Sequence, residues 1–169
     1  VTVDSAGWAV VWRAKSGEFL HQFRDLEEGH LPSAKILEVQ VFLDGDRFVT
    51  LGSDKLVVIW KISLGGVLRR LNTTEFGGHR TMRLLPEGDR LITAVSLRAD
   101  GPAVIWDLFW GSVLYELTQL DDSMRFIEVA PCGTKLVSAS FEMLLVWDVG
   151  RGAARPQVPL PLGGQRRHL

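Results

Sequence analysis

A short apolar segment that ends in tryptophan, or in tryptophan followed by aspartate, occurs four times along the 169-residue chain. The copies occupy residues 9–12, 56–60, 103–107 and 144–148. Successive tryptophans lie 48, 46 and 41 residues apart. A repeat of roughly 40–50 residues is typical of stacked structural units, and the β-branched residues of these segments favour strands. This recurrence predicts an array of small β-sheets.

The residues between the tryptophans follow one order of strand and turn signals. Residues 25–71 are the most complete unit: Gly29-His30, a candidate strand at 36–42, an Asp44-Gly45 turn and a second strand precede the tryptophan segment. An Asp-Gly pair tolerates the positive φ that tight hairpins require. The same order predicts units at residues 72–117 and 118–150 and the second half of a unit at 1–24. Because Gly or Pro interrupts the apolar runs before two helical turns are complete, the pattern favours an all-β fold over helices.

The composition changes after Gly150. Residues 151–169 contain three of the seven prolines, four arginines and no acidic residue. This composition is compatible with a proline-disrupted last strand within residues 151–162 or with a loose tail, and we expect residues 163–169 to be flexible.

The net charge, the cysteine count and the lengths of the apolar runs argue against several classes of function. A formal net charge of −1 gives no general attraction to nucleic acid or to an anionic membrane. The single cysteine excludes an internal disulfide and a cysteine-only metal site. No apolar run approaches the roughly 18–20 residues of a membrane helix. With no signal-peptide pattern at the start, we expect an intracellular protein, cytoplasmic rather than nuclear, and a chain that is a piece of a longer one.

The sequence also lacks the motifs of common catalytic sites. It contains no Walker loop, no dinucleotide fingerprint, no His-Glu-x-x-His and no Gly-x-Ser-x-Gly. The four histidines are scattered along the chain. We therefore expect no catalytic residues, no cofactor and no metal, and a protein that is not an enzyme.

The units resemble WD40 repeats. The matching features are Gly29-His30 and Gly78-His79 at the starts of units, the Gly-containing turns, and the Trp106-Asp107 and Trp147-Asp148 dipeptides. The resemblance covers residues 1–150 and implies a β-propeller of four-stranded antiparallel blades. It divides the chain into half a blade at 1–24, blades at 25–71 and 72–117, and a blade at 118–150 whose outer strand lies in 151–162. Since rings of this family usually have seven or eight blades, it implies an incomplete ring that other residues complete; a small four-bladed ring is the alternative.

The resemblance also implies a buried hydrogen-bonded network around each tryptophan. In the second unit the network would consist of His30, Thr50, Asp54 and Trp60. In the third unit it would consist of His79, either Thr93 or Ser96, Asp100 and Trp106. The fourth unit departs from the pattern, because its opening has no histidine and Glu142 stands where aspartate is usual; only Trp147 remains there.

The candidate partner-binding residues are Arg80, Arg125, Phe109 and Trp110. The resemblance places the two arginines toward the rim at which the family commonly binds peptides. The two aromatic residues follow Trp106-Asp107 in a loop, where they either anchor a partner or fold back over the blade. We expect a non-catalytic protein–protein interaction scaffold that binds proteins or peptides and the remaining blades of its propeller. The alternatives are a regulatory WD-repeat domain of a NACHT-type nucleotide-binding protein and a chromatin- or nucleic-acid-binding propeller.

Overall fold

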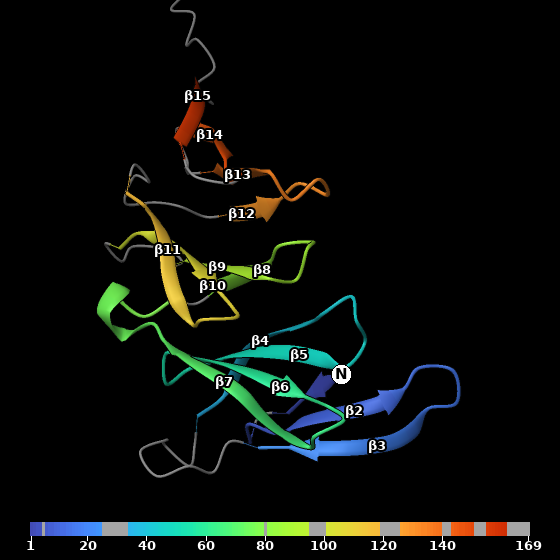
Figure 1. Ribbon diagram of the computed structural model, residues 1–169. Coiled ribbons are helices and arrows are strands. Elements are labelled where there is room, and N and C mark those ends of the chain that lie inside the picture. The colour runs from blue at the N-terminus through green and yellow to red at the C-terminus, as the bar shows by residue number, and fades with distance from the viewer. Residues whose placement is uncertain are drawn as a thin grey trace, which may run out of the picture. The chain divides into compact units, whose positions relative to one another are not determined.

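The computed structural model describes residues 1–4, 6–24, 34–79, 81–94, 101–118, 126–139, 143–150 and 155–161. In these residues the chain is almost entirely β, with fifteen strands and one short 3-10 helix at Thr74–Phe76. The strands form four antiparallel sheets, one of three strands and three of four (Figure 1). The prediction of an all-β chain is therefore confirmed.

Each sheet is built from strands that are consecutive in the sequence. The first sheet contains β1 (Thr2–Val3), β2 (Ala9–Arg13) and β3 (Glu18–Phe23). The second contains β4 (Ile36–Val41), β5 (Arg47–Gly52), β6 (Leu56–Lys61) and β7 (Gly66–Asn72). The third contains β8 (Thr81–Leu84), β9 (Arg90–Ala94), β10 (Ala103–Asp107) and β11 (Ser112–Leu117). The fourth contains β12 (Phe126–Val129), β13 (Lys135–Ala139), β14 (Met143–Asp148) and β15 (Arg155–Pro161).

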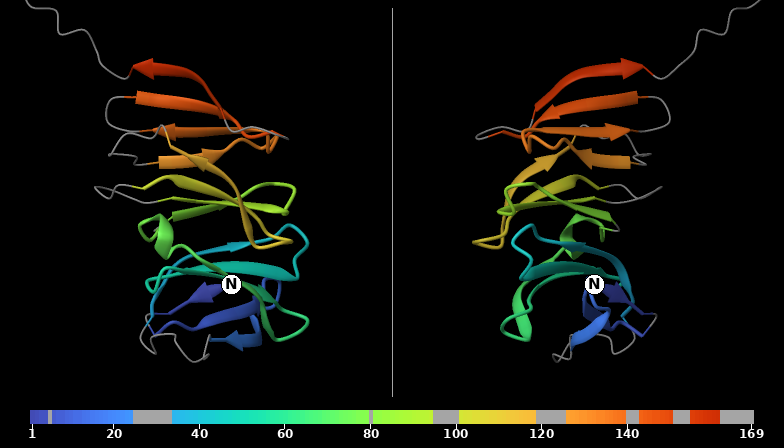
Figure 2. Two further views of the ribbon diagram at one scale, coloured as in Figure 1. Left: turned by 60° about the vertical axis from the view of Figure 1, so that its left-hand side comes forward. Right: turned by 90° about the vertical axis from the view of Figure 1, so that its right-hand side faces the viewer.

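The last of these strands bears on the open question about residues 151–162. Here β15 pairs antiparallel with β14 and forms the outer strand of the fourth sheet, drawn in orange to red in Figure 2. Proline lacks the N–H that a central strand must donate, so its presence at three positions of β15 fits the edge of a sheet. The expected flexible tail at 163–169 lies outside the described residues.

A β-bulge recurs at the same place in all four sheets. The register between the tryptophan strand and the outer strand shifts just before Trp12, Trp60, Trp106 and Trp147. In each case one extra residue of the outer strand is left without a partner, which bends the strand and increases its local twist. The four tryptophan strands are therefore equivalent in their pairing as well as in their sequence.

The turn between the first two strands also recurs in the three four-stranded sheets. A glycine occupies it with φ between 70° and 72°, a region that side-chain-bearing residues rarely adopt. The N–H of the residue before the turn donates to the carbonyl five positions later at 2.9–3.0 Å. These glycines and donors are Gly45, Gly88 and Gly133, with Phe42, Leu85 and Ala130. The turn signals that predicted the hairpins thus correspond to a backbone requirement.

The chain forms two compact units, Val1–Met82 and Arg83–Leu169. The core of the first lies between its first and second sheets. Phe23 of β3 contacts the rings of Phe48 and Trp60 edge to face, with centroids 5.2 and 5.7 Å away. The other buried members of this core are Ala9, Val11 and Val58. The apolar side of the first sheet and the apolar side of the second sheet therefore cover each other.

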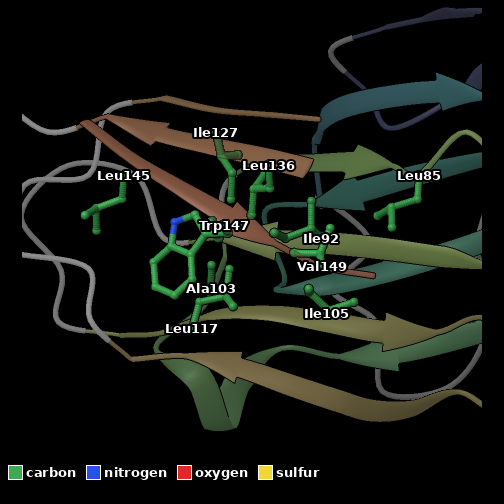
Figure 3. Packing of buried hydrophobic residues seen from close by; sticks show 11 residues of the cluster. Leu85, Ile92, Ala103, Ile105, Leu117, Ile127, Leu136, Leu145, Trp147 and Val149 are labelled. Carbon is green, nitrogen blue, oxygen red and sulfur yellow. The ribbon is translucent and has the colours of Figure 1, made fainter. Parts of the chain in front are cut away.

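The core of the second unit has the same construction. Trp147 and Leu145 of β14 pack with Ala103, Ile105 and Leu117 of the third sheet (Figure 3). Trp147 is 2% exposed, and Ala103 and Leu117 are fully buried. Burying such apolar area from water is the main stabilising term for paired sheets.

A carboxylate in the first unit joins two turns of the second sheet. Asp46 accepts the Ser63 hydroxyl at 2.7 Å and the Ser63 backbone N–H at 2.8 Å. These hydrogen bonds, the one from the Ser63 hydroxyl above all, lower the pKa of Asp46 below its ordinary value. A carboxyl whose pKa is lower in the folded than in the unfolded chain stabilises the fold above its unfolded pKa, and this contribution disappears as pH falls through the folded pKa.

We therefore expect the Ser63→Ala variant to be less stable than the wild type at pH 7, and the difference to shrink as the pH falls below about 4, the ordinary pKa of an aspartate. Urea unfolding of both proteins at pH 7, 5, 4 and 3 measures this difference in stability. Ser16→Ala, in the corresponding turn of the first sheet, is the control and should show no such dependence. A difference that stays constant down to pH 3 would contradict the role assigned to Asp46.

Candidate functional site

Each of the four tryptophans donates its indole N–H to a hydroxyl on the preceding strand of its own sheet. The pairs are Trp12–Thr2 at 2.8 Å, Trp60–Thr50 at 2.9 Å, Trp106–Thr93 at 2.7 Å and Trp147–Ser138 at 2.8 Å. A buried indole N–H without an acceptor would carry a desolvation cost, so the hydroxyls allow three of these tryptophans, Trp60, Trp106 and Trp147, to be buried. The repeat therefore includes a polar pair as well as an apolar segment.

In the second sheet the structure brings together two of the four residues that were expected to form a network. Thr50 and Trp60 are buried and hydrogen-bonded. Asp54 lies in the turn before β6, where its carboxylate accepts the Leu56 N–H at 3.3 Å. A Cβ at Gly52 would meet this carboxylate, so a larger residue there would require the Asp54 side chain to move. His30 lies outside the described residues.

In the third unit of the sequence, the Thr93 hydroxyl accepts the indole N–H of Trp106, and both side chains are buried. His79 is 1% exposed. Its ring stacks on Phe76 with centroids 6.0 Å apart, and its backbone N–H donates to the Thr73 hydroxyl at 3.3 Å. The two remaining candidates, Ser96 and Asp100, lie outside the described residues.

The fourth sheet contains a hydroxyl that sequence reasoning missed. Ser138 is 2% exposed and accepts from Trp147, although only the tryptophan had been singled out there. Ser138 precedes Trp147 by nine residues, while the corresponding separation is ten in the first and second sheets and thirteen in the third. Because the separation varies and Thr134 also falls within this range ahead of Trp147, spacing alone does not select Ser138.

One of the four tryptophans differs from the others in exposure. Trp12 is 43% exposed, whereas Trp60, Trp106 and Trp147 are at most 4% exposed. Trp12 meets Phe19 edge to face, with ring centroids 5.9 Å apart, and Phe19 is itself 52% exposed. The tryptophan side of the first sheet is therefore an apolar surface open to solvent, although the matching side of the second sheet is buried in the core of the first unit.

Two neighbouring aromatic residues occupy the turn between β10 and β11. Phe109 is 70% exposed and Trp110 is 72% exposed. Their rings meet edge to face at a centroid distance of 4.7 Å and an interplanar angle of 90°. Large aromatic side chains at this exposure are uncommon on a protein surface unless they contact something else.

The turn that carries this pair is held at several points. The Asp107 carboxylate accepts the backbone N–H groups of both Phe109 and Trp110 at 2.8 Å. Gly111, with φ of 73°, donates its N–H to the Asp107 carbonyl at 2.8 Å. Leu108 is buried, so it anchors the start of the turn in the core. The two aromatic side chains therefore project from a fixed backbone.

The other two candidate binding residues, Arg80 and Arg125, lie outside the described residues.

Within the described part of the chain, no three His, Cys, Asp or Glu side chains are grouped so that they could hold a metal ion. Among the same residues, no helix has the length and apolar character needed to cross a membrane.

Comparison with known proteins adds no family assignment. No protein-family model matches the sequence. A search of curated proteins also finds no match.

Proposed function

We propose that this chain is a segment of a WD40-type β-propeller that acts as a non-catalytic protein–protein interaction scaffold. The architecture supports the proposal, because four sheets of consecutive antiparallel strands share a bulge before the tryptophan and an indole–hydroxyl hydrogen bond. Stacked units of this kind bury their apolar sides against one another, which is the construction of a propeller.

The open side of the first sheet supports the second part of the proposal, that further blades belong to the same ring. Trp60 and Trp147 each pack on the neighbouring sheet of their own unit. Trp12 has the same pairing and the same kind of hydrogen bond but remains 43% exposed. Another sheet of the repeat would cover it in the way that the first sheet covers Trp60.

The observation that carries the scaffold function is the exposed pair of Phe109 and Trp110. Aromatic residues contribute much of the binding energy at protein interfaces because they bury a large area with few rotatable bonds. Here Asp107 fixes the backbone on which they stand, so little conformational entropy is lost when a partner covers them. A rigid turn with two solvent-facing rings is well suited to docking a protein segment.

The test is affinity capture of partners from cells with the wild-type chain and a Phe109→Ser/Trp110→Ser double variant. We expect the variant to keep the circular dichroism spectrum and melting temperature of the wild type but to lose at least one specifically bound protein. Phe126→Ser is the matched control, since Phe126 is 72% exposed on β12, and it should retain that protein. Identical sets of bound proteins from the folded double variant and the wild type would contradict the scaffold function of this turn.

A further inference from the structure

We propose that the Phe109–Trp110 turn binds a cationic peptide segment, one that presents Arg or Lys side chains, of a partner protein. This inference rests on the proposed function and adds the chemistry of the partner. It depends on the charges around the two rings, which come from their own turn and from the turn between β8 and β9.

The two turns lie side by side in the third sheet. The Leu108 N–H donates to the carbonyl of Asp89 at 2.8 Å, which places the turn at residues 86–89 next to the aromatic turn. Asp89 and Glu87 present carboxylates whose side chains are 65% and 47% exposed. Asp107 adds a third carboxylate, which accepts the backbone N–H groups of the two aromatic residues.

Arg90 is the one basic residue of these two turns and the strand positions beside them. Its side chain is only 14% exposed. The guanidinium donates to the Val149 carbonyl at 2.7 Å and lies 3.3 Å from Glu87 and 3.5 Å from Asp89. Arg90 therefore offsets one of the three negative charges of Glu87, Asp89 and Asp107, and the groups around the aromatic pair keep a formal excess of two negative charges.

This combination matches the chemistry of a cationic side chain. A guanidinium or ammonium group is attracted to the face of an indole ring, and the planar guanidinium also stacks on it. Nearby carboxylates add electrostatic attraction and oppose the approach of an acidic segment. The corresponding turn of the second sheet lacks the aromatic pair, because Leu64 is its exposed apolar residue. It retains a carboxylate in Asp46, but Lys61 stands in the place of Asp107.

The probe is a fluorescein-labelled peptide of sixteen residues with alternating Arg and Ala and blocked ends, titrated with the purified chain and followed by anisotropy. Peptides with Glu or Ser in place of Arg test the sign of the charge. We expect binding of the Arg peptide only, with an affinity that falls as salt is raised from about 50 to 500 mM, because screening weakens exposed charge pairs. Binding of the Glu peptide with equal affinity would overturn the proposal.

Two sets of variants locate the site. We expect Trp110→Ala, and Glu87→Gln combined with Asp89→Asn, each to weaken binding about fivefold or more. Phe126→Ala and Glu128→Gln are the matched controls, as both residues are exposed on β12, and should bind like the wild type. Equal binding by wild type and Trp110→Ala would overturn the proposal. If the double serine variant loses its captured partner while the Arg peptide fails to bind, the scaffold function stands and the cationic specificity is wrong.

Discussion

Replacement of Trp60 by alanine should lower the free energy of unfolding of the first unit by about 3–5 kcal/mol, the range for removing a large aromatic side chain from a core. Trp60 is 4% exposed and lies in the core between the first and second sheets. Its ring stacks on Phe48 at 5.8 Å and meets Phe23 edge to face at 5.7 Å. Alanine would leave a cavity at this junction and would also leave the Thr50 hydroxyl without its indole donor.

Trp12→Ala is the matched control for this experiment. Trp12 occupies the equivalent position of the first sheet and makes the same kind of hydrogen bond, but it is 43% exposed. We expect its loss to cost about 1 kcal/mol, as is usual for changes that create no core cavity. Urea unfolding of both variants, followed by circular dichroism, makes the comparison. Equal destabilisation by the two substitutions would contradict the different burial of the two tryptophans.

The strands were predictable from the sequence because their signals are local. The apolar run that ends at Trp60 and the Asp44-Gly45 turn each depend on neighbouring residues, and both appear in the structure at the expected places. The outer strand in residues 151–162 remained one of two alternatives, since its prolines count against a strand in general. Because β15 pairs with β14 along one edge and lies at the end of its sheet, the missing N–H groups of its prolines are tolerated.

The details of the candidate site were less predictable because they depend on pairing between strands. The bulge before each tryptophan follows from the register with the outer strand, which the sequence of one strand does not specify. The role of Ser138 depends on the position that it takes opposite β14. The exposure of Phe109 and Trp110 depends on the conformation of a turn whose backbone is hydrogen-bonded to Asp107, and a loop sequence alone leaves both orientations open.

The indole–hydroxyl pairs also account for a polar residue within otherwise apolar inner strands. Thr93 is fully buried on β9, between the apolar residues Ile92 and Ala94. A hydroxyl at such a position is costly unless it is hydrogen-bonded, and its partner here is the Trp106 N–H at 2.7 Å. Removing the hydroxyl therefore leaves a buried donor unsatisfied rather than simply deleting one contact.

We accordingly expect Thr93→Val to destabilise the chain by about 1–3 kcal/mol, the cost of one buried unsatisfied group, although valine has nearly the same shape and is more apolar. Thr93→Ser retains the hydroxyl and therefore the hydrogen bond. Its free energy of unfolding should fall below that of the wild type only by the contribution of the missing methyl group. Urea unfolding measures the stability, and the NMR signal of the Trp106 indole N–H reports the bond directly. If Thr93→Val were as stable as the wild type while Thr93→Ser was not, packing of the methyl group, and not the hydrogen bond to Trp106, would explain the residue.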